Sequence, residues 1–179
     1  MSHNVSGQAY ALTVLTPVLD GHAQPLVAHL DALGDGDASP LARVPGTHIA
    51  RWVVLDDVKY QGAGQRHRDR LQSARLLFSS NFDGDLDRYL EGLRTGMGAD
   101  ADAIWGHCRG YPGHEDGAAF AAYMRAHQLE ATLFFAAYGD QTVEQIHANV
   151  AQRRRLIDFA LATQGLDAAA LKARFLETF

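Results

Sequence analysis

Two kinds of segment alternate along this chain, and their order limits the fold more than any other feature. Short apolar runs rich in β-branched residues are typical of strands, whereas longer stretches with apolar residues at helical spacing are typical of helices. We expect strands at residues 9–18, 48–55, 75–80 and 103–108. One helix is expected after the first strand and another after the third. The predicted order is therefore β-α-β-β-α-β, which indicates an α+β fold.

The last third of the chain adds elements to this unit. We expect a short helix at residues 120–127, a fifth strand at 131–138, a long helix at 142–162 and a last helix at 168–176. Thr142 and Gln145 form a capping-box pattern at the start of the long helix. Its apolar residues are expected to face inward: Val143, Ile146, Val150, Ile157 and Phe159. The predicted architecture is one domain over residues 1–179, with a core at 9–108 and a helix-strand-helix extension at 113–179.

Composition and charge exclude several classes of protein. The chain has 179 residues, a formal net charge of -5 and a pI near 5.9. A general nucleic-acid binder would need a basic surface to displace counterions, so nucleic acid is not an expected partner. The single cysteine, Cys108, excludes an internal disulfide and a cysteine-rich metal site. No window has the apolar length of a membrane span, and residues 1–7 lack a signal-peptide pattern, so we expect a cytoplasmic protein.

The order of elements over Ala9–Cys108 resembles the ferredoxin-like fold, and within it the dimeric α+β barrel proteins. In those proteins two sheets from two protomers pack face to face around a pocket. Members include EthD-type monooxygenases and the haem-binding chlorite dismutases and dye-decolorising peroxidases. The resemblance implies a homodimer, a small apolar molecule as ligand and haem as a candidate cofactor. The GxxDG signature of the peroxidases is absent, since Phe82-Asp83-Gly84-Asp85 lacks its leading glycine.

The segment Trp105-Gly106-His107-Cys108 is the most unusual local sequence. In a strand, His107 and Cys108 point to opposite faces and cannot ligate one ion together. His107 would share its face with Trp105, where a neutral imidazole could ligate a haem iron or act as a general base. The alternative is a partly buried structural histidine that bonds to backbone groups. Cys108 is expected to be buried and unreactive.

A second group of candidates lies on the predicted strand at residues 48–55. His48 begins this strand and shares a face with Trp52, while Arg51 lies on the other face with Ile49 and Val53. A cation among apolar residues needs a carboxylate partner or an anionic ligand. His147 is a further candidate on the long helix, since helical histidines ligate haem in several barrels of this kind. The predicted catalytic residues are His107, His48 and Arg51, and the predicted cofactor-binding residues are His107, His147, Trp105 and Trp52.

Other patterns support no specific site. Asn81, Asp83, Asp85 and Asp87 suggest calcium by their oxygen ligands, but the EF-hand template lacks its final glutamate, so helix capping explains the acids better. The polar segment 56–73 is long enough to act as a lid. Motifs of zinc proteases, serine hydrolases and phosphate-binding loops are absent.

Two functions therefore remain open, and the sequence favours the first. The first is an oxidoreductase-like protein with an apolar pocket and haem as its candidate cofactor, in which His48 or His107 acts with Arg51. The second is a non-catalytic ligand-binding or accessory domain, which the lack of a matched catalytic set favours. Whether the protein is an enzyme is left open.

Overall fold

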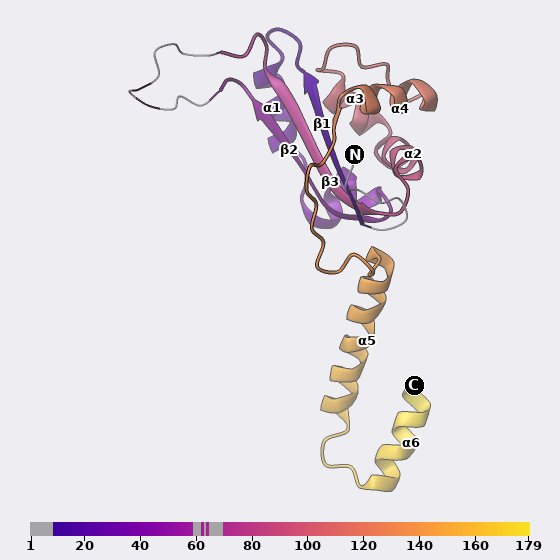
Figure 1. Cartoon of the computed structure of the whole chain (residues 1–179). Helices are drawn as coiled ribbons and strands as arrows, with labels where there is room; N and C mark the ends of the chain where they lie inside the picture. The colour runs from indigo at the N-terminus through magenta and orange to yellow at the C-terminus, as the bar shows by residue number, and fades with distance from the viewer. Residues whose placement is uncertain (1–8, 59–61, 63, 65–69) are drawn as a thin grey trace. The chain divides into compact units, whose positions relative to one another are not determined.

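The computed structural model describes residues 9–58, 62, 64 and 70–179, which form two compact units. The first unit runs to Asp140 and the second covers Gln141–Phe179. Figure 1 labels the elements of both units. Part of the predicted lid, namely residues 59–61, 63 and 65–69, lies outside the described residues.

A four-stranded antiparallel sheet forms the centre of the first unit. Its strands are β1 (Ala9–Pro17), β2 (Thr47–Leu55), β3 (Arg75–Asp83) and β4 (Gln128–Leu129), in the order β2-β3-β1-β4. The expectation of an α+β fold is confirmed. The first strand is nearly as expected, and β3 runs three residues beyond the predicted end at Ser80.

One face of the sheet is buried, because successive side chains of a strand point to opposite faces. Every fully buried side chain of β1 and β3 belongs to this face: Leu12, Val14, Thr16, Leu76, Phe78, Ser80 and Phe82. The residues between them in sequence are only partly buried. The alternation over both central strands fixes their register, since a slip of one residue would move the apolar set to the other face.

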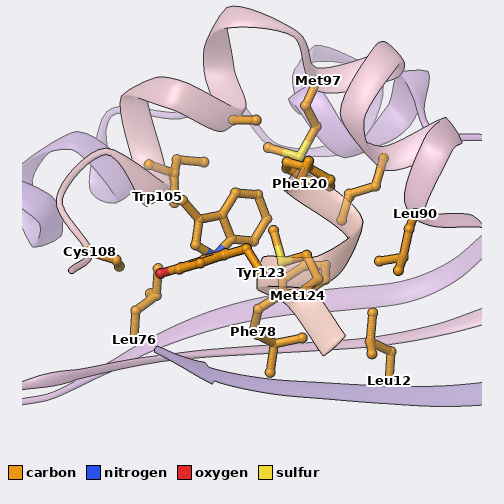
Figure 2. Close-up of a cluster of buried hydrophobic side chains, with 14 of the residues drawn as sticks. Leu12, Leu76, Phe78, Leu90, Met97, Trp105, Cys108, Phe120, Tyr123 and Met124 are labelled. Carbon is orange, nitrogen blue, oxygen red and sulfur yellow. The ribbon is translucent and has the colours of Figure 1, made fainter. Parts of the chain in front are cut away.

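Helices cover the buried face. They are α1 (Ala23–Asp31), α2 (Leu86–Met97), α3 (Ala99–Trp105) and α4 (Gly117–Ala126), with the 3-10 turns Gly36–Ala38 and Pro40–Arg43 before β2. Figure 2 shows Trp105, Phe120 and Met124 packed over the strand side chains of Leu12 and Phe78. Tyr89 of α2 stacks on Phe82, with ring centroids 3.6 Å apart. The labelled core side chains of Figure 2 all lie on the helix-bearing side of the sheet.

The predicted strand at residues 103–108 is wrong, because this region belongs to helix α3 and the turn that follows it. The short run Ala-Ile-Trp fits either element by periodicity alone. Helical spacing places Ala101, Ile104 and Trp105 on one buried face, and Asp100 and Asp102 lie in the first turn, where acidic residues stabilise a helix. Only Cys108 makes a β-bridge, to Val18. The fourth strand is instead the short β4.

The predicted fifth strand at residues 131–138 is also wrong, since none of these residues is in a helix or strand. Leu133, Phe135 and Tyr138 are 84%, 83% and 75% exposed. High β propensity does not make a strand without a neighbour to accept its backbone hydrogen bonds and cover its side chains.

The second unit is a pair of helices, α5 (Val143–Ala162) and α6 (Ala168–Thr178). The predicted capping box is confirmed, with Thr142 and Gln145 bonding each other's backbone N–H groups. Phe159 contacts Phe175 and Phe179 of the other helix. The predicted inward stripe is wrong at Val150 and Ile157, which are 44% and 45% exposed. No described helix is both long and apolar enough to cross a membrane.

Candidate functional site

The second face of the sheet is the candidate site, and we call it the open face. No side chain of this face is fully buried, and the edge residues Ile49, Val53 and Leu55 are 70%, 39% and 36% exposed. The open face comprises alternate residues of three strands: Ile49, Arg51, Val53 and Leu55 of β2; Arg75, Leu77, Ser79, Asn81 and Asp83 of β3; and Ala9, Ala11, Thr13, Leu15 and Pro17 of β1. Single exposed apolar residues are ordinary, whereas contiguous ones often mark a binding surface.

The register of the strands sorts the open face into rows of different chemistry. Arg51 pairs with Ser79, which pairs with Thr13 on its other side, and these three residues make a polar row. The next row on this face is apolar and contains Val53, Leu77 and Leu15. Directly opposed side chains lie about 4.5–5.5 Å apart at Cβ, so each row is a continuous strip across the sheet. The open face therefore presents a polar strip beside an apolar one.

Arg51 provides the positive charge of the polar strip. Its guanidinium makes no ion pair or hydrogen bond with any other residue that the structure describes. Its neighbours along β2 on the same face are Ile49 and Val53, so no acid follows it on its own strand. The sequence suggested either a carboxylate of the chain or an anionic ligand as the partner of Arg51. No such carboxylate is found among the described residues.

His48 lies at one end of the open face, at an irregularity of β2. The register shifts between Thr47 and Ile49, and this bulge redirects the side chain between them. The imidazole Nε2 of His48 lies 2.7 Å from Oδ1 of Asp83, and both side chains are about one-fifth exposed. His48 therefore joins an open-face residue, while its neighbour Thr47 bonds the core residue Tyr89. A carboxylate partner fixes the orientation of an imidazole, as it does for many histidines that bind a metal or move a proton.

No family model, curated protein or solved structure matches this chain.

His107 lies far from His48, in the turn that follows α3. Its Nδ1 is 3.0 Å from Nδ1 of His22, so one ring donates and the other accepts. Burial, together with the nearby His22 and His29, lowers the pKa of His107 below its ordinary value. The backbone carbonyl of His107 accepts a hydrogen bond from Leu19, close to Pro17 at the opposite end of β1 from Asp83. The length of β1 therefore separates His48 and His107 by roughly 25 Å, so they do not meet within one chain.

The two indoles predicted to bind a cofactor meet in the core. Trp105 is fully buried, and its ring lies 6.2 Å from that of Trp52 and 5.4 Å from that of Phe78. Trp52 also borders an open pocket of about 410 Å³ beside the C-terminal end of α1. The pocket includes Asp31 and Asp35, which disfavour an anionic ligand. His147, the third cofactor candidate, is an exposed residue of α5 in the second unit.

Cys108 is buried as expected, and burial raises the pKa of its thiol. Its sulfur accepts a hydrogen bond from the hydroxyl of Thr16 at 3.2 Å. Because the thiolate is the reactive form, this environment keeps the side chain unreactive. Asp85 caps α2 through the N–H groups of Asp87 and Arg88, which confirms the capping interpretation for this residue, whereas Asp83 pairs with His48 and Asp87 with Arg125.

No sequence pattern indicated the polar network that surrounds Asp102. One carboxylate oxygen accepts hydrogen bonds from the hydroxyl of Tyr111 and the backbone N–H of His114, both at 2.9 Å. The other lies 2.6 Å from Nδ1 of His114. Burial alone would raise the pKa of Asp102, but these bonds hold it below its ordinary value. The partners are separated by irregular chain, which has no periodicity to reveal them. Among the described residues, no three His, Cys, Asp or Glu side chains are placed to hold a metal ion.

Proposed function

We propose that this protein is a small-molecule-binding domain whose ligand lies on the open face of the sheet. The observation that carries the proposal is the apolar strip of Val53, Leu77 and Leu15, which no described helix covers. Burial of apolar surface contributes about 25 cal/mol per Å², so an uncovered strip favours a ligand with an apolar body. Of the two functions that the sequence left open, this is the non-catalytic ligand-binding one.

The topology supports the same proposal by resemblance. A sheet in the order β2-β3-β1-β4, with helices on one face, is similar to the ferredoxin-like fold. In this chain α3 and α4 are inserted between the second long helix and the last strand. In dimeric α+β barrels the uncovered faces of two such sheets enclose the ligand. We accordingly propose a homodimer in which a second copy covers the open face.

One observation keeps an enzymatic function as the second candidate. His48 is oriented by Asp83 at the end of the same face that carries Arg51. An oriented imidazole beside a bound molecule can act as a general base. This arrangement supports the oxidoreductase-like function through His48 and Arg51. The roles of His107, His147 and haem, and cytoplasmic residence, stay predictions.

Binding of a neutral apolar dye tests the main proposal. N-phenyl-1-naphthylamine becomes fluorescent when it enters an apolar site. We expect the full chain to bind this dye and Val53→Glu to weaken binding by at least tenfold, because the new carboxylate would be desolvated beneath the ligand.

The matched control is Leu171→Glu on α6, since Leu171 and Val53 are both 39% exposed. If Leu171→Glu weakens dye binding as much as Val53→Glu does, the dye does not bind on the open face and the proposal is overturned. Retention of full dye binding by a folded Val53→Glu protein would do the same.

A further inference from the structure

The polar strip next to the apolar strip defines the ligand more closely. We propose that the open face binds a carboxylate-bearing molecule, with its carboxylate on Arg51 and its apolar body on Val53, Leu77 and Leu15. This inference rests on the proposed function and adds the chemical class of the ligand.

Of the charged residues on the open face, Asp83 pairs with His48 and Arg75 donates to Ser73, whereas the guanidinium of Arg51 has no partner among the described residues. Arg51 lies between Ile49 and Val53 on an exposed strand, with no carboxylate of the described chain bonded to it. Covering this face with a ligand would remove water from the guanidinium, and a desolvated cation without an anion is costly. A ligand that covers the apolar strip therefore needs an anionic group at Arg51.

The hydroxyl groups beside Arg51 suit a carboxylate. Ser79 stands directly opposite Arg51, and Thr13 follows in the same row. A planar guanidinium binds a carboxylate through two parallel N–H groups, and each hydroxyl can donate one further bond. The open face also contains Asp83, which would repel a second negative charge. A singly charged carboxylate is thus better matched than a doubly charged phosphate.

The spacing of the rows fits a medium-length apolar chain. Residues two apart along a strand are about 6.6 Å apart, so the apolar strip begins one such step from Arg51. The strip crosses three strands, which spans roughly 10 Å between the outer backbones. An eight-carbon chain can lie across it with the carboxylate at the polar strip.

Calorimetric titration of the full chain with octanoate, octanol, octylamine and octyl phosphate tests the inference. We expect octanoate to bind most tightly and octylamine most weakly. Arg51→Gln should weaken octanoate binding by about tenfold or more, which is the usual loss of a charge-assisted hydrogen bond. The affinity for octanol should stay within about twofold, because octanol carries no charge to pair with Arg51. Arg51→Lys should give an intermediate loss, since an ammonium cannot bind bidentately.

Arg88→Gln is the matched control, because Arg88 is an exposed arginine on helix α2, on the covered side of the sheet. It should leave octanoate binding unchanged. If octyl phosphate binds more tightly than octanoate, the preferred anionic group is a phosphate and the assignment of a carboxylate is overturned.

The two proposals fail separately. If Val53→Glu abolishes dye binding but Arg51→Gln leaves octanoate affinity unchanged, the proposed function stands and the assignment of a carboxylate ligand is rejected. If the unsubstituted chain binds neither the dye nor octanoate, the proposed function and the carboxylate assignment are both rejected.

Discussion

At the scale of single residues, pairs of polar side chains define this protein, and the chemistry of each pair depends on a partner distant in sequence. His22 and His107 share one hydrogen bond across 85 positions, and His48 and Asp83 share one across 35. The first pair is compatible with two neutral rings. If both rings were protonated, each would present an N–H to the other, so proton uptake works against the folded state.

The His22–His107 pair predicts a pH dependence of stability. The folded state lowers the pKa of His107 below the ordinary value of 6.5, so the unfolded chain binds this proton more readily. Stability should therefore rise with pH through this region and fall as pH drops below about 6.5. Urea denaturation at several pH values between 5 and 8 measures the slope. His107→Gln should flatten the slope.

His147→Gln serves as the control, because His147 is exposed on α5. The nearby charged groups Asp20 and Arg109, which pair at 2.6 Å, are unchanged in both variants. An equal slope for the unsubstituted chain and for His107→Gln would contradict the prediction.

At the scale of elements, the ends of helices are well specified by local sequence. Asp85, Asp116, Thr142 and Asp167 each cap a helix through side-chain oxygens, and each is followed by helical spacing. The glycine between α2 and α3 is equally local in its effect. Gly98 has φ +54°, a conformation that other residues rarely adopt, and it separates two helices that a regular residue would join.

The cap of α2 gives a prediction at this scale. Replacing Asp85 with Ala removes the acceptor for two backbone N–H groups and should destabilise the protein by about 1 kcal/mol. Asp85→Asn keeps the cap and should cost less than half as much. Urea unfolding followed by circular dichroism compares the variants. An equal loss for Asp85→Asn and Asp85→Ala would contradict the prediction and show that the charge of Asp85, not its capping oxygen, stabilises α2.

At the scale of the whole molecule, residues 131–138, near the end of the first unit, form an accessible irregular segment. They contain no charged side chain, and Leu133, Phe135 and Tyr138 are exposed while Phe134 is partly buried. Chymotrypsin cleaves after aromatic residues in accessible, irregular chain. We therefore expect brief digestion to cut first after Phe134, Phe135 or Tyr138.

Mass spectrometry of the early fragments checks this prediction. The triple variant with Phe134, Phe135 and Tyr138 changed to Ala should lose the first cut and keep the later ones. Initial cleavage within residues 9–58 instead would contradict it, as would resistance of the whole segment. Resistance would indicate that a second copy covers residues 131–138.

The local sequence was sufficient for the face of β2 that carries Ile49, Arg51 and Val53, for the caps at Asp85 and Thr142, and for the burial of Cys108. Each depends on periodicity or on groups within one helical turn. It also placed Arg51 among apolar residues and so required an anionic partner. It failed for residues 103–108 and 131–138, because short apolar runs fit either helix or strand until a neighbouring strand is available.

Tertiary structure alone decided which polar groups meet. The bulge at His48 brings its imidazole to Asp83, the turn after α3 brings His107 to His22, and the strand register sets Arg51 beside Ser79 and Thr13. These contacts join residues 28 to 85 positions apart and depend on the order in which strands pair. That order is set by burying one apolar face against the helices, which is a property of the whole chain and of no single segment.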